Sequence, residues 1–100
     1  MKTEIHFVNA VKNEALEILV NEKLDQLESK YDWVVSAYVF LKTNNSSDGK
    51  NYECEIRLSV PGPQLFVHTC ETNFNKAILE AVQELTMVLK KKKEKFFSNN

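Results

Sequence analysis

Apolar residues recur at steps of three and four positions through the last third of the chain. This spacing predicts an α-helix with one core-facing side. Thr72 or Asn73 can accept a hydrogen bond from the first turn, and no Gly or Pro interrupts the run. After Leu89 the apolar stripe ends, and residues 90–95 carry charge on every side of the helix. A helix over residues 73–95 would be about 34 Å long, whereas an eight-residue strand spans about 27 Å, so we expect the lysine-rich end to overhang the sheet.

The rest of the chain alternates between strand and helix patterns. Period-two alternation predicts four strands, Asn13 can cap a second helix, and turn formers at residues 44–49 and 61–64 separate the last three strands. A strand, a helix and a parallel strand form a right-handed crossover, and the two short connections then form a meander. The expected class is α+β, a single domain over residues 1–100 in which a four-stranded mixed sheet carries both helices on one face. The expected strands cover residues 3–8, 32–41, 52–60 and 65–69, and the expected helices cover residues 14–30 and 73–95.

The alternation also predicts which residues share a face of the sheet. In the last hairpin we expect Val60 to pair with Leu65 and Arg57 to lie across from His68. In the second strand we expect Val35 to face the helices together with the later odd-numbered residues. The open face would then carry Tyr38, Phe40, Phe66 and His68.

Two accounts fit the aromatic residues of this open face. They can pack against one another or against a second copy of the chain, because an uncovered apolar patch often marks an interface. Alternatively, they can stack unpaired RNA bases. Glu53 and Glu55 lie beside them and would repel a phosphate backbone. We therefore predict a candidate interface for a weak homodimer here, rather than an RNA platform.

The composition argues against several functional classes. The 100 residues are 43% hydrophobic and 27% charged, which is ordinary for one globular domain. There is no long apolar segment near the first residue and no run of about 18 apolar residues, so we expect a cytoplasmic protein without membrane contact. The chain has only two glycines and no phosphate-binding glycine loop. We expect neither an enzyme nor a cofactor.

The cysteines and histidines add little chemistry in this arrangement. Cys54 and Cys70 fall on opposite faces of the sheet, so we expect free thiols in a reducing compartment. Neither has a candidate catalytic base. His6 and His68 both point to the open face, but no third ligand arrives at metal-binding spacing, so no metal site is expected.

Charge is distributed unevenly along the chain. Residues 1–89 carry 8 Lys or Arg against 13 Asp or Glu, whereas residues 90–100 carry five lysines against one glutamate. Cations in the last turn of a helix also interact favourably with its dipole, by about 0.3–1 kcal/mol each. The lysine run is therefore consistent with helix stabilisation as well as with phosphate binding.

Several short motifs follow one another along nearly the whole chain. They are Lys23-Leu24, Tyr31-Asp32, Val39-Phe40-Leu41-Lys42, Val60-Pro61-Gly62 and the run from Leu89 to Lys95. Their order and spacing resemble the ribosome hibernation promoting factors, also called ribosome-associated inhibitors or sigma-54 modulation proteins, of the short type.

The resemblance implies a stress-response protein of stationary phase or starvation. It would bind the small ribosomal subunit near the decoding centre, block mRNA and tRNA sterically, and so silence translation. Basic side chains on the helices contact rRNA phosphates in that family. The residues that match these positions, or extend them, are Lys23, Lys90, Lys91, Lys92, Lys93 and Lys95.

The chain also departs from the family pattern. Gln26 and Ser29 stand where lysines are common, and residues 86–88 replace basic residues in the middle of the last helix. The resemblance is therefore to a diverged member. The alternative function is a protein-interaction or homodimeric domain that has kept the fold and lost ribosome binding.

Overall fold

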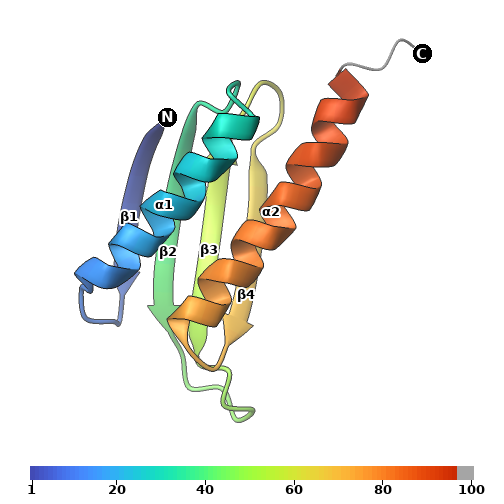
Figure 1. The fold of residues 1–100 in the computed structure, drawn as a ribbon. Coiled ribbons are helices and arrows are strands. Elements are labelled where there is room, and N and C mark those ends of the chain that lie inside the picture. The colour runs from blue at the N-terminus through green and yellow to red at the C-terminus, as the bar shows by residue number, and fades with distance from the viewer. Residues whose placement is uncertain (97–100) are drawn as a thin grey trace.

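Two helices lie on one face of a four-stranded sheet in the computed structural model, which describes residues 1–96 (Figure 1). The sheet runs in the order β1-β2-β3-β4, with β1 parallel to β2 and the other neighbours antiparallel. This confirms the predicted α+β fold. The elements are β1 (Lys2–Val8), α1 (Glu14–Lys30), β2 (Ser36–Thr43), β3 (Tyr52–Ser59), β4 (Leu65–Glu71) and α2 (Phe74–Phe96).

An asparagine side chain caps the N-terminus of each helix. The Asn13 side chain accepts a hydrogen bond from the Leu16 N–H at 3.2 Å, and the Asn73 side chain accepts one from the Lys76 N–H at 2.8 Å. Each bond satisfies one of the free donors of a first helical turn. The residue that caps α2 is therefore Asn73, the second of the two candidates.

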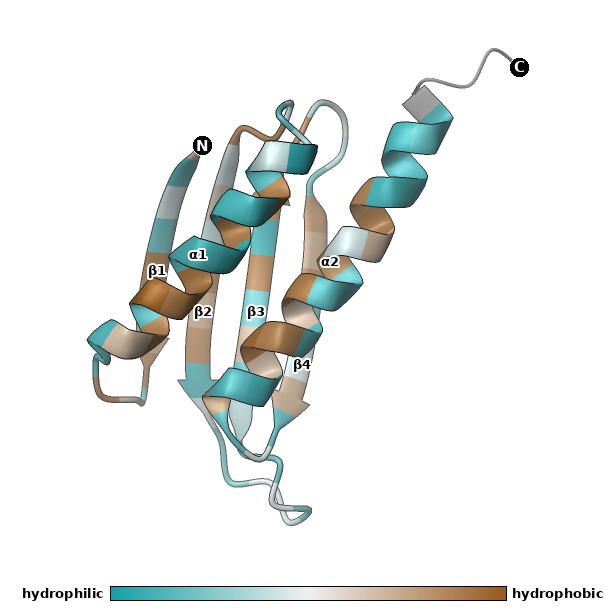
Figure 2. Ribbon diagram, in the orientation of Figure 1, coloured by the Kyte–Doolittle hydropathy of each residue, from teal (hydrophilic) through white to brown (hydrophobic). Residues whose placement is uncertain are grey.

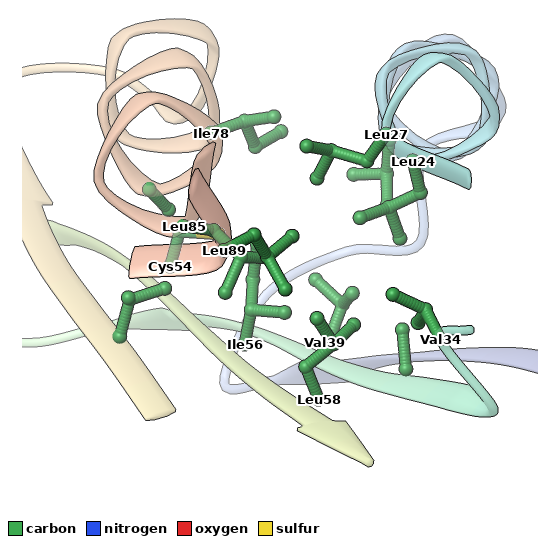
Figure 3. Close-up of a cluster of buried hydrophobic side chains, with 14 of the residues drawn as sticks. Leu24, Leu27, Val34, Val39, Cys54, Ile56, Leu58, Ile78, Leu85 and Leu89 are labelled. Atoms are coloured by element: carbon green, nitrogen blue, oxygen red, sulfur yellow. The ribbon is translucent and has the colours of Figure 1, made fainter. Parts of the chain in front are cut away.

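The core lies between the helices and the sheet. Leu24 and Leu27 of α1 and Ile78, Leu85 and Leu89 of α2 form one buried cluster with side chains from the inner face of the strands, and Ile78 points toward Leu27 (Figure 3). Beyond this core the last turns of α2 are hydrophilic and extend past the sheet, as predicted (Figure 2). No helix within residues 1–96 is long and apolar enough to cross a membrane.

The predicted register of the last hairpin is wrong by two residues. Leu58, not Val60, pairs with Leu65, and Arg57 lies across from Phe66 rather than His68. Pro61 and Pro63 have no N–H to donate, and the residue between them has a φ of +97°, so the ladder starts further from the turn. A shift of two residues leaves every side chain on its predicted face.

The predicted face of Val35 is also wrong. Val35 is 60% exposed, and Val34 occupies the core in its place. The cause is the turn after α1, in which the Val34 N–H donates to the carbonyl oxygen of Tyr31. Strand alternation begins only at Ser36, after this turn.

Candidate nucleic-acid interface

Helices α1 and α2 border two adjoining hollows, which together we call the interhelical groove. The larger has a volume of about 830 Å³ and the smaller about 340 Å³, and they share Lys30 and Thr86. Lys30, Tyr31, Thr86, Lys90, Lys93 and Glu94 line the larger hollow, and Lys23, Gln26, Leu27, Ser29, Lys30, Val82 and Thr86 line the smaller.

Four lysines reach this groove, two from each helix. Lys23 and Lys30 are seven residues apart on α1, and Lys90 and Lys93 are three apart on α2, so each pair shares one side of its helix. Glu94 is the one acidic residue that lines the groove within residues 1–96. The groove therefore carries a net positive charge although the chain as a whole is slightly acidic.

Lys93 is held toward α1 by an aromatic ring. Its Nζ atom lies 5.8 Å from the centroid of Tyr31, a distance at which an ammonium is attracted to the face of a ring. Tyr31 is itself buried and packs edge-on against Trp33, with ring centroids 5.9 Å apart. The ammonium of Lys93 is thus positioned beside the C-terminal end of α1.

The other predicted lysines point elsewhere. Lys91 lines a separate hollow of about 340 Å³ on the β4 side of α2, and Lys95, four residues later, shares that side of the helix. The Nζ atom of Lys92 lies 3.4 Å from the position that a Cβ atom on Gly62 would occupy, so it approaches the β3–β4 hairpin. Of the six predicted lysines, the groove brings together Lys23, Lys90 and Lys93.

Lys30 was not among the lysines predicted from the sequence. Lys30 lies seven residues after Lys23, which places both lysines on one side of α1. This spacing could have identified Lys30 as a second basic residue of the site. None of the ion pairs within residues 1–96 involves a groove lysine; they lie on the open face of the sheet and at the first residue. Among the described residues, no salt bridge therefore neutralises a groove lysine.

The open face of the sheet surrounds Phe40 with charged groups. The His6 ring stacks on Phe40 at 5.1 Å, and the guanidinium of Arg57 lies 5.0 Å from its centroid. Glu55, only 7% exposed, accepts hydrogen bonds from Arg57 at 2.9 Å and from Lys42 at 3.3 Å. Phe40 is thus covered by side chains of its own molecule.

The four candidate interface residues of the open face do not form one apolar patch. Arg57 lies between Tyr38 and Phe66 in the sheet, and Glu55 lies between Phe40 and His68. Phe66 is 57% exposed but lines the hollow on the β4 side of α2. Charged residues therefore divide this candidate interface.

The two cysteines lie on opposite faces of the sheet, as predicted. Cys54 is buried in the core, where desolvation raises the pKa of its thiol to about 12. Cys70 is partly exposed, and burial followed by the charge of Glu53 raises its thiol pKa as well. His6 lies 3.5 Å from Glu4 and His68 lies 2.6 Å from Glu53, on strands at the two edges of the sheet.

The fold and the groove define a small α+β domain that presents lysines between two helices. The family model described as "Sigma 54 modulation protein / S30EA ribosomal protein" matches residues 3–96. The chain therefore belongs to this family, which confirms the resemblance seen in the sequence. A comparison with curated proteins finds no match.

Solved structures share the whole architecture. A ribosomal subunit interface protein from Coxiella burnetii superposes with a TM-score of 0.83 at 17% sequence identity, covering 93% of this chain and 98% of that one. The N-terminal domain of Protein Y from Thermus thermophilus has a TM-score of 0.76 at 25% identity, covering 91% of this chain and 98% of that one. The first likeness concerns the fold alone, because the identity is low.

Proposed function

We propose that this chain is a ribosome-associated translation inhibitor that binds rRNA of the small subunit near the decoding centre and blocks mRNA and tRNA sterically. The observation that carries the proposal is the interhelical groove, where four lysines gather in a member of a ribosomal protein family. Ribosome association would place the protein in the cytoplasm, and its action would fall in stationary phase or starvation.

The geometry of the groove suits an RNA backbone. Lysine ammonium groups are compact point charges that bind phosphate oxygens, and two pairs on facing helices can contact phosphates from both sides. The overhanging end of α2 lets RNA approach without meeting the sheet (Figure 1). Selectivity would come from the fit of the domain, because structured RNA is recognised largely by shape and backbone.

The number of groove lysines sets the expected salt dependence. Each phosphate contact contributes about −0.7 to −0.9 to the slope of log affinity against log salt, so four contacts give about −2.8 to −3.6. Neutral residues, Gln26, Ser29 and Thr86, line the groove between the lysines. We therefore expect binding that is strong at low salt and is readily lost as salt rises.

Gradient sedimentation with purified small subunits tests the proposal. The protein should co-sediment with them at low salt, leave them as salt increases, and be displaced by bound mRNA and tRNA. The same experiment on lysates should recover more protein with ribosomes from starved than from growing cells. Protein that stays in the free fractions throughout the salt series would contradict the proposal.

The alternative of a homodimer through the open face has less support. Its aromatic residues are separated by Arg57 and Glu55, and Phe40 is already covered by His6. Light scattering distinguishes the two functions, because it measures whether the protein is a monomer or a dimer. A dimer that Phe66→Glu converts to a monomer, in a protein that ignores ribosomes, would favour the alternative.

A further inference from the structure

Three side chains of different metal-binding types converge on the open face of the sheet. They are Glu53 of β3 and His68 and Cys70 of β4, and one ligand atom from each lies within 4.8 Å of the others. The Glu53 Oε1 and His68 Nε2 atoms are 2.6 Å apart. We propose that this cluster binds one Zn²⁺ ion through a carboxylate oxygen, an imidazole nitrogen and a thiolate sulfur.

The register of the β3–β4 hairpin creates the cluster. Glu53 is the direct partner of Cys70, and His68 is two residues before Cys70, so all three point to the same face. In the register predicted from the sequence, Cys70 would lie across from Glu55 instead. His68 and Cys70 share a face in either register, but only the observed register places Glu53 directly across from Cys70.

The ligand set matches the chemistry of zinc. Zn²⁺ prefers four tetrahedral ligands among cysteine sulfur, histidine nitrogen and carboxylate oxygen, at about 2.0–2.3 Å. Tetrahedral ligands at these distances are about 3.3–3.8 Å apart, so the cluster needs side-chain shifts of only about 1 Å to reach that geometry. The partly exposed position leaves room for water as the fourth ligand.

A neighbouring side chain orients the carboxylate. The Asn44 side-chain N–H donates to Glu53 Oε2 at 2.7 Å, which leaves Oε1 directed toward His68. Asn44 is itself held by the loop, since its backbone N–H donates to the Asn51 carbonyl oxygen at 2.9 Å. Hydrogen bonds of this kind around metal ligands fix their orientation and typically strengthen metal binding.

The local charge also favours a dication. The carboxylates of Glu53 and Asp48 lie near the Cys70 thiol, and Lys50 is the one cation that opposes them among the charged groups acting on this thiol. A bound metal ion would deprotonate the coordinating thiol, and the proton would pass to solvent.

The cluster is independent of the interhelical groove. It lies on the face of the sheet away from the helices, beside the β2–β3 loop, and none of its residues lines the groove. Loss of zinc binding would therefore leave the proposed ribosome binding untouched, and the reverse also holds.

Titration with Co²⁺ alone, under reducing conditions, tests the site. We expect one ion per chain, a near-ultraviolet charge-transfer band from thiolate to cobalt, and displacement of cobalt by Zn²⁺. Cys70→Ser should remove the band, and His68→Asn should weaken Co²⁺ affinity at least tenfold. Asn44→Ala should weaken it about 10-fold to 100-fold, in line with other residues that orient metal ligands.

His6→Asn is the matched control, because His6 also lies beside a glutamate, Glu4, but has no cysteine there. It should bind Co²⁺ as the unmodified chain does. A cobalt spectrum without the thiolate band, or equal affinity in Cys70→Ser and the unmodified chain, would overturn the proposal.

Discussion

Leu89 is the residue at which α2 passes from the core to solvent. It is fully buried, whereas the next residue, Lys90, is exposed and lines the groove. Packing of Leu89 therefore fixes the last core turn of the helix, on which the groove lysines depend for their position. A change confined to this one side chain tests that dependence.

Leu89→Ala should lower the free energy of unfolding by about 2–5 kcal/mol, because it removes buried methyl groups and leaves a cavity. Urea denaturation measures the change. The neighbouring Val88 is 37% exposed, so Val88→Ala should alter stability by no more than about 0.5 kcal/mol. Equal losses in the two variants would mean that Leu89 is not anchored in the core.

Single residues of the site were only partly predictable. Lys23 and the lysines of residues 90–95 were predicted from motifs and charge. No local pattern indicates which lysines of a turn that is charged on every side will point toward the other helix. Tyr31 was named as part of a sequence motif, and its contact with Lys93 joins the end of α1 to the end of α2. Such contacts depend on how the helices pack, which periodicity within one helix does not define.

The two helices together determine how many phosphates the groove can contact. Thr86 stands between the lysine pairs and lines both hollows, and its hydroxyl donates to the Val82 carbonyl oxygen at 2.8 Å. A lysine at this position would add a cation to the middle of the groove without changing the core.

Thr86→Lys should therefore tighten binding to small subunits at low salt and steepen the salt slope by about 0.7–0.9, the contribution of one more phosphate. Met87→Lys adds the same charge on an exposed position, 58% accessible, beside the hollow on the β4 side. Fluorescence anisotropy with labelled protein measures the affinity and the salt slope of the two variants. An equal gain from Met87→Lys would show that total charge, rather than the groove, controls affinity.

The element order and, except at Val34 and Val35, the faces of the strands were predictable because each strand alternates and each helix has a continuous apolar stripe. Register was not. Pro61 and Pro63 remove donors near the turn, so the first pair forms at Leu58 and Leu65. This shift of two residues leaves the core residues on their predicted face. It changes which glutamate lies across from Cys70 on the open face, from Glu55 to Glu53.

Positive charge is concentrated in one part of the molecule, the interhelical groove and the lysine-rich end of α2. Carboxylates such as Glu53 and Glu55 lie on the open face of the sheet, paired with histidine, lysine or arginine. The groove on the other side of the sheet carries cations without such pairs within residues 1–96. A negatively charged partner would therefore be attracted to the groove and to the overhanging end of α2.

The salt dependence of binding to small subunits tests most directly whether RNA is bound in the groove. The unmodified chain should give a slope of about −2.8 to −3.6, and Lys90→Gln with Lys93→Gln should reduce its magnitude by about 1.4–1.8. Lys91→Gln with Lys95→Gln removes the same charge from the other side of α2 and should leave the slope near that of the unmodified chain. Equal flattening by the two double variants, or by neither, would contradict binding in the groove.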